Sequence, residues 1–185
     1  FIIGISRSNM KKKKLTGGKK KKISKKKNHS KGNNPTNTVL RRANFIKMTR
    51  VRGGNFKFKA ISLGKGSFQW KTMQLSKNSK ILSVLYNQAN LKLVQKRNLS
   101  KGTIIKIDSM PFIKTILTNQ RSFIDLLKFQ IDKMILLKLL NKGLLIARIT
   151  SRPGQTGKIN GTIMEDYDLK LFFRISRKMK KLIPY

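Results

Sequence analysis

Residues 55–60 read NFKFKA, and this short stretch decides the class of fold. Phe56, Phe58 and Ala60 alternate with two lysines. Because successive side chains of a β-strand point to opposite faces, the alternation predicts a strand with apolar side chains on one face and cations on the other. We expect this strand to be half-buried, with its phenylalanines in a core.

Further stretches with strand character follow at short intervals, separated by turn-type sequences such as GKG and NQAN. They cover residues 67–75, 80–86, 91–97, 103–108, 144–150 and 162–164. Short strands joined by short turns are typical of an antiparallel barrel or sandwich. The predicted fold is therefore mainly β, a small antiparallel β-barrel with added helices.

Two segments have helical character. Residues 122–142 begin with Ser122 three positions before Asp125, which resembles a capping box, and end at a glycine-containing stop. This helix belongs to an insertion at about 113–143. A second helix is expected from about residue 168, with acids at its start and basic residues towards its end, which suits the helix dipole.

Charge is distributed very unevenly along the chain. The 185 residues hold 44 Lys+Arg against 6 Asp+Glu, a formal net charge of +38, and no acid precedes Asp108. Two unit charges 10 Å apart in water repel by about 0.4 kcal/mol, and a chain this basic contains hundreds of such pairs. A polyanion would offset the repulsion, and nucleic acid is the usual one.

The first residues are rich in Lys, Asn, Gly and Ser and poor in apolar side chains. We expect residues 1–48 to form an extended basic arm that orders on a partner, and residues 49–185 to form the barrel domain. The chain opens on Phe1 rather than methionine, so a short upstream piece is expected to be absent.

A membrane is the competing partner for a basic chain. The amino-terminal lysine runs have no apolar face to insert, and charges interrupt the longest apolar region, 123–140. We therefore expect no membrane partner. The chain has no cysteine, which suits a reducing compartment, and its only histidine, His29, is expected to be solvated or to contact phosphate.

The sequence offers few combinations of residues that could form a catalytic site. A P-loop ending at Gly157 and Lys158 would need glycine where Arg152 stands and Ser or Thr where Ile159 stands. The acids at 165, 166 and 168 could hold magnesium, but favourable charge at a helix start explains them better. We expect no enzymatic activity, catalytic residue, cofactor, metal or small-molecule substrate.

Nucleic-acid binding has better support. Arginines can grip phosphate bidentately, and they gather where folded structure is expected to begin; they are Arg41, Arg42, Arg50, Arg52, Arg148 and Arg152. The sequence RVRGGN at 50–55 adds two glycines that permit close approach to a sugar-phosphate chain, or that form an ordinary turn. Phe56, Phe58, Phe68 and Trp70 either stack on bases or, as we expect from their strand spacing, form core.

Several of these stretches together resemble a known family, the eukaryotic and archaeal e-type small-subunit ribosomal protein eight. The matching segments are GISRSN at 4–9, TGGK at 16–19, RVRGGNFKFKAISL at 50–63, GSFQW at 66–70, VLYNQANLKLV at 84–94, IDSMPF at 107–112 and SRPGQTGKINGTIMED at 151–166. The chain departs from the family after IDSMPF, where a short apolar segment replaces a long charged insertion.

The resemblance implies a structural constituent of the small ribosomal subunit that binds and stabilises its RNA and supports assembly and translation. It also implies neighbouring small-subunit proteins as partners and a cytoplasmic ribosome, assembled in the nucleolus, as the location. The alternative is a ribosome-biogenesis factor of the same family, bound only to precursor particles. A weaker one is a nonspecific nucleic-acid compactor.

Charge and resemblance together predict a set of RNA-binding side chains in the arm, in the strand at 55–60 and in the basic loops. They are Arg7, Lys11, Lys12, Lys13, Lys14, Lys19, Lys20, Lys21, Lys22, Lys25, Lys26, Lys27, Arg41, Arg42, Arg50, Arg52, Lys57, Lys59, Arg152 and Lys158.

Overall fold

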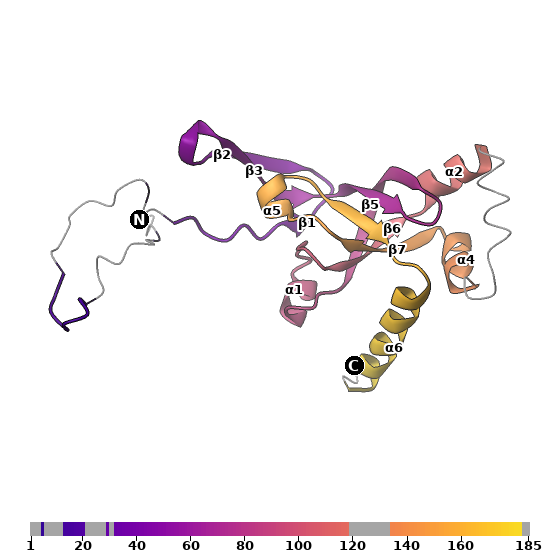
Figure 1. Ribbon diagram of the computed structural model, residues 1–185. Coiled ribbons are helices and arrows are strands. Elements are labelled where there is room, and N and C mark those ends of the chain that lie inside the picture. Colours follow the sequence, from indigo (N-terminus) through magenta and orange to yellow (C-terminus); the bar gives the residue numbers. More distant parts are fainter. Residues whose placement is uncertain (1–4, 6–12, 21–28, 30–31, 119–133, 183–185) are drawn as a thin grey trace.

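The computed structural model describes residues 5, 13–20, 29, 32–118 and 134–182 (Figure 1). Its strands are β1 (Val39–Leu40), β2 (Phe45–Arg50), β3 (Phe56–Leu63), β4 (Lys65–Trp70), β5 (Leu75–Tyr86), β6 (Ile104–Asp108), β7 (Leu144–Ile149) and β8 (Asn160–Ile163). Its helices are α1 (Leu91–Gln95), α2 (Met110–Thr118), α4 (Met134–Asn141), α5 (Pro153–Thr156) and α6 (Asp166–Leu182), with a 3-10 turn at Arg52–Gly54.

Five strands close into a barrel in the order β4-β5-β6-β7-β8. Neighbouring strands are antiparallel except at the closure, where β4 and β8 run parallel and Phe68 lies opposite Gly161. Closure removes the unpaired edges that an open sheet would expose. The predicted fold class, a small β-barrel with added helices, is confirmed.

The barrel interior is filled by side chains from alternate positions along its strands. Phe68 on β4, Ile105 and Ile107 on β6, and Leu145 on β7 are all fully buried. Trp70 is 3% exposed and meets the ring of Phe112 on α2 edge to face, with ring centroids 6.1 Å apart. The expectation that Phe68 and Trp70 form core is confirmed.

A second, three-stranded sheet has the order β1-β3-β2, and its β2–β3 hairpin projects beyond the barrel (Figure 1). The strand predicted from NFKFKA is confirmed as part of β3, but the expectation that its phenylalanines are buried is wrong. Phe56 is 53% and Phe58 51% exposed, whereas Ala60 is fully buried where β3 reaches the barrel. The alternation reports the strand's period, and burial depends on what packs over the face.

One predicted strand is a helix. Residues 91–97 were expected to be extended, but Leu91–Gln95 form α1. The side-chain oxygen of Asn90 accepts a hydrogen bond from the backbone N–H of Lys92 at 2.8 Å, as an N-cap residue does. The cap lay in the sequence NQAN, which was interpreted only as a turn.

The other helices match the predictions in part. α4 ends at Asn141, and Gly143 adopts φ +71°, so the predicted helix stop is confirmed. The start predicted at Ser122 and Asp125 lies outside the described residues. The C-terminal helix is confirmed and begins at Asp166. β2 crosses the boundary proposed between residues 48 and 49, so that division of the chain stays a prediction.

Gly64 joins the hairpin sheet to the barrel and leaves no space for a side chain. A Cβ atom there would lie 2.3 Å from the carbonyl oxygen of Arg41. The Gly64 N–H donates to Asn44 Oδ1 at 2.9 Å, and its carbonyl accepts from the Ile81 N–H at 2.9 Å. The backbone is thus held on both sides and cannot move away easily.

We expect Gly64→Ala to lower the free energy of unfolding by about 1–3 kcal/mol, since an added methyl group forces the backbone to shift. Urea denaturation followed by circular dichroism measures the change. Gly18→Ala is the matched control, because the nearest atom to its Cβ is 3.9 Å away. Equal denaturation midpoints for the two variants would contradict the conclusion that Gly64 has no space for a side chain.

Candidate nucleic-acid interface

The β2–β3 hairpin has one cationic and one apolar face. Residues directly opposite each other in an antiparallel pair share a face, and Lys47 lies opposite Lys59. Lys57, two residues before Lys59, shares this face because side chains alternate along a strand. The other face carries Met48 opposite Phe58, and Met48 is 58% exposed.

The hairpin tip carries two arginines around a turn that requires glycine. Gly53 and Gly54 adopt φ +74° and +78°, a backbone conformation that side chains rarely permit. No atom lies within 4 Å of a Cβ placed at Gly54, so turn conformation rather than crowding explains this glycine. Arg50 and Arg52 are exposed on either side of the turn.

A basic loop around α5 lies beside the hairpin. A Cβ on Gly157 would come within 2.8 Å of Phe58 Cβ, which leaves room only for glycine. Lys57 Nζ donates to Gln155 Oε1 at 3.2 Å. Arg152 precedes α5 and Lys158 follows Gly157, and both side chains are exposed. The fold thereby brings two basic segments, joined by a contact across 98 positions of sequence, to one surface.

The described parts of the arm have little internal packing. The backbone N–H of Gly32 donates to the Ile5 carbonyl at 2.6 Å, so these two points of the chain lie side by side. The Arg52 guanidinium donates to the His29 carbonyl at 2.6 Å, which links the arm to the hairpin tip. Residues 32–38 continue without helix or strand towards β1.

The structure describes twelve of the predicted RNA-binding residues, and all but Lys20 and Lys59, which are half-buried, are exposed. They are Lys13, Lys14, Lys19 and Lys20 in the arm, Arg41 and Arg42 after β1, Arg50 and Arg52 at the hairpin tip, Lys57 and Lys59 on β3, and Arg152 and Lys158 around α5. Arg7, Lys11, Lys12, Lys21, Lys22, Lys25, Lys26 and Lys27 lie outside the described residues.

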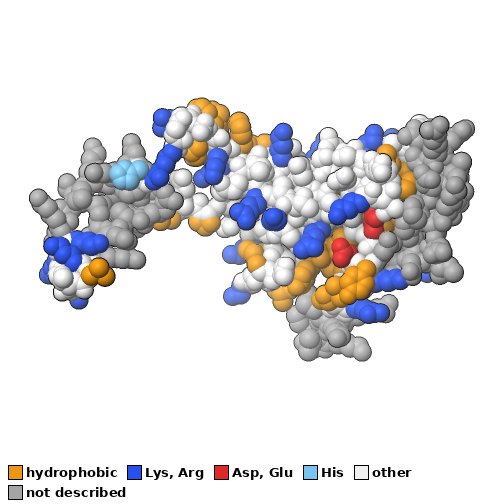
Figure 2. Space-filling view, in the orientation of Figure 1, with side chains coloured by type: hydrophobic (Ala, Val, Ile, Leu, Met, Phe, Trp, Pro, Cys, Tyr) orange, Lys and Arg blue, Asp and Glu red, His pale blue; other side chains and the backbone are white. Residues whose placement is uncertain are grey.

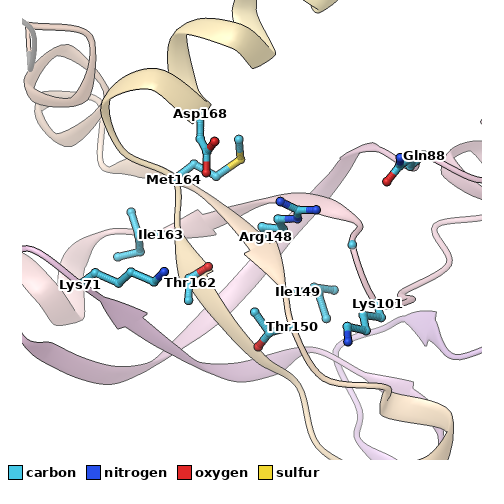
Figure 3. Close-up of a pocket in the computed structure, with 11 residues that line it drawn as sticks. Lys71, Gln88, Lys101, Arg148, Ile149, Thr150, Thr162, Ile163, Met164 and Asp168 are labelled. Atoms are coloured by element: carbon cyan, nitrogen blue, oxygen red, sulfur yellow. The ribbon is translucent and has the colours of Figure 1, made fainter.

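Sequence reasoning missed other cations that share these surfaces. Lys47 joins the cationic hairpin face only through strand pairing. Lys71 and Lys101 line a hollow on the outside of the barrel together with Arg148, an arginine noted from the sequence but not assigned to any site (Figure 3). No local pattern links residues 71, 101 and 148. In the sequence, the one available signal was an arginine, Arg148, within the apolar run LLIARI of β7.

The acids at the start of α6 have a structural explanation. Glu165 precedes the helix and accepts hydrogen bonds from the backbone N–H and the hydroxyl of Thr72, and Asp166 is the first helical residue. Their position confirms the helix-start interpretation. Among the residues described, no group of three or more acidic or histidine side chains is placed to hold a metal ion.

Basic side chains lie over the arm, the hairpin and the barrel on the face drawn in Figure 2, and the acidic ones seen there lie on the barrel side, away from the hairpin. Within the described ranges, no helix is long and apolar enough to cross a membrane. A small closed barrel, a projecting amphipathic hairpin and an acid-free leading segment define a class: a strongly basic small-barrel protein.

Comparison with known proteins gives the family. The ribosomal protein S8e family matches residues 7–164. Proteins named small ribosomal subunit protein eS8 are similar to almost the whole chain. The one from Caenorhabditis elegans is 31% identical over 96% of this chain and 99% of its own length, and the one from Theileria annulata is 32% identical over 97% and 100%. The eS8A protein of Saccharomyces cerevisiae is 30% identical over 93% and 97%.

The chain belongs to the ribosomal protein S8e family, as the motifs in its sequence predicted. It is accordingly a ribosomal protein and not an enzyme.

Proposed function

We propose that this chain is a structural constituent of the small ribosomal subunit and that its arm, hairpin and α5 loop bind and stabilise small-subunit RNA, supporting subunit assembly and translation. Its other partners are neighbouring small-subunit proteins. It acts in the cytoplasmic ribosome after assembly in the nucleolus. The names of its relatives and the basic surfaces described above support this proposal.

One observation carries the proposal. Lys47 and Lys59 lie directly opposite each other on the cationic face of the hairpin, with Lys57 beside them. Like charges in opposite positions destabilise a strand pair unless an anion lies between them. The hairpin tip adds Arg50, which lies opposite Phe56 on the other face, and Arg52 in the turn; their planar guanidinium groups match phosphate oxygens. A phosphate backbone laid along the lysine face would remove the repulsion between Lys47 and Lys59.

Sedimentation of a cell lysate at high salt tests the proposal. A structural constituent stays with mature small subunits, and this is the expected result. A biogenesis factor would sediment only with precursor particles, and a nonspecific compactor would follow DNA. Either of these two distributions would overturn the structural role.

Replacing Arg50 and Arg52 together with alanine is expected to reduce incorporation into small subunits several-fold. The tip holds both guanidinium groups at one turn, whereas phosphate binding along the lysine runs is redundant. Lys13→Ala with Lys14→Ala removes the same charge from the arm and is the matched control. Quantitative mass spectrometry of gradient-purified subunits measures the incorporation of both variants. Equal incorporation would contradict a larger contribution of the two tip arginines than of two arm lysines.

A further inference from the structure

A hollow on the outer wall of the barrel has no role in the surfaces considered so far. We propose that it holds one unstacked guanosine nucleotide of the bound RNA, with the phosphate between Lys71 and Arg148 and the base at Asp168. This inference rests on the proposed RNA-binding function and names a separate site within it.

The hollow is built from segments distant in sequence. Its volume is about 550 Å³, within the roughly 300–1,000 Å³ of pockets that hold small ligands. Arg148 on β7 pairs with Thr162 on β8, so both side chains stand on the outer face of the barrel. The turn at Lys101 and Gly102 forms another wall, fixed by a 2.8 Å hydrogen bond from the Gly102 N–H to the Ile149 carbonyl.

The cations around the hollow are available for an anion. Figure 3 shows the Lys71 side chain reaching towards Thr162, with the Arg148 guanidinium on the other side and Lys101 beyond it. Within the described ranges, the charged ends of these three side chains form no ion pair or hydrogen bond. Convergent lysine and arginine suit phosphate, since arginine can bind it bidentately and lysine adds a point charge.

The remaining wall suits a base. Met164 is 7% exposed, and its thioether lies beside Asp168 in Figure 3. Sulfur packs favourably against aromatic rings. The Asp168 carboxylate only accepts hydrogen bonds, and guanine presents two adjacent N–H donors on its Watson–Crick edge. Sequence-specific RNA recognition commonly uses unstacked bases bound in this manner.

A neighbouring protein's acidic side chain is the competing occupant. It would satisfy Lys71 and Arg148, but a carboxylate accepts hydrogen bonds and donates none, so it would leave Asp168 without a donor. The presence of one carboxylate beside three cations in the lining favours a ligand that carries both an anion and N–H donors. A nucleotide has both.

Methyl NMR of the full chain, labelled at isoleucine and methionine, tests the site with GMP, UMP and inorganic phosphate at equal ionic strength. We expect GMP to shift the Met164 and Ile163 resonances and to bind about fivefold or more tightly than UMP, as a lost bidentate base contact implies. Phosphate alone is expected to move them far less. Equal shifts with all three, or shifts confined to Met48 of the hairpin, would overturn the inference.

Asp168→Asn separates base recognition from phosphate binding. The neutral amide no longer accepts both guanine N–H groups, so the preference for GMP over UMP is expected to fall to about twofold or less. Affinity for inorganic phosphate should not fall, because the change removes a negative charge. Retention of the full GMP preference would contradict the assigned contact.

RNA affinity provides a readout on the natural ligand. Lys71→Gln with Arg148→Gln is expected to weaken binding to small-subunit RNA about tenfold, the effect of losing a charge-assisted bidentate contact. The matched control is Lys92→Gln with Lys96→Gln, two exposed cations at α1 outside the hollow, with an expected change within about twofold. Equal losses would overturn the inference and leave the proposed function intact, whereas failure of the unmodified chain to bind this RNA would overturn the function itself.

Discussion

Raising the salt concentration from 50 to 200 mM is expected to weaken binding of the full chain to small-subunit RNA by about 10³–10⁵-fold, the range for 6–10 phosphate contacts. Each cation that neutralises a phosphate releases a condensed counterion, and the affinity falls as salt opposes that release. With a net charge of +38 and exposed cations on the arm, hairpin and α5 loop, this chain has more than enough cations for such contacts.

Filter binding or fluorescence anisotropy across a salt series measures the effect. For roughly ten contacts, log K plotted against log salt concentration should have a slope near −7 to −9. Replacing the four described arm lysines 13, 14, 19 and 20 with alanine should make the slope shallower by about 3, at 0.7–0.9 per lost contact. A slope near zero would refute the electrostatic basis of binding.

The second large effect is on stability. Phe68→Ala is expected to lower the free energy of unfolding by about 3–5 kcal/mol, because Phe68 is fully buried and its removal leaves a cavity where β4 meets β8. The whole free energy of unfolding of a small domain is only about 5–15 kcal/mol. The variant should therefore unfold at a much lower denaturant concentration.

Phe56→Ala is the matched control, since the same atoms are removed from a side chain that is 53% exposed. Its free energy of unfolding should change by less than about 1 kcal/mol. Fluorescence of Trp70, which is buried beside Phe112, reports unfolding of both variants in guanidinium chloride. Similar losses for Phe56→Ala and Phe68→Ala would mean that the hairpin face is packed as tightly as the barrel.

The two phenylalanines also show how far sequence alone reaches. Both stand in strands with period-two patterns, and both were predicted to be core. Only Phe68 is, because β8 closes the barrel over it from more than 90 positions away. No described element covers Phe56 in the same way. A strand's own residues determine which side chains share a face, but not which face receives a partner.

The candidate interface divides in a similar manner. Lysine runs, paired glycines and the arginines at 50 and 52 are visible in the sequence, so the basic arm and hairpin tip were predictable. The hollow was not, because its lysines at 71 and 101 follow no shared motif and meet Arg148 only through the pairing of β7 with β8 and the turn before β6. The helix α1 was predictable in principle from its cap at Asn90.

By itself, the sequence determined the separation of charge, the strand-rich architecture and the family, because composition, periodicity and short motifs are local properties. Tertiary structure decided the parallel closure of the barrel, the exposure of the hairpin's aromatic face and the assembly of the hollow. The physical reason is that each of these depends on contacts between residues far apart in the chain, whose free energy is gained only when the whole barrel closes.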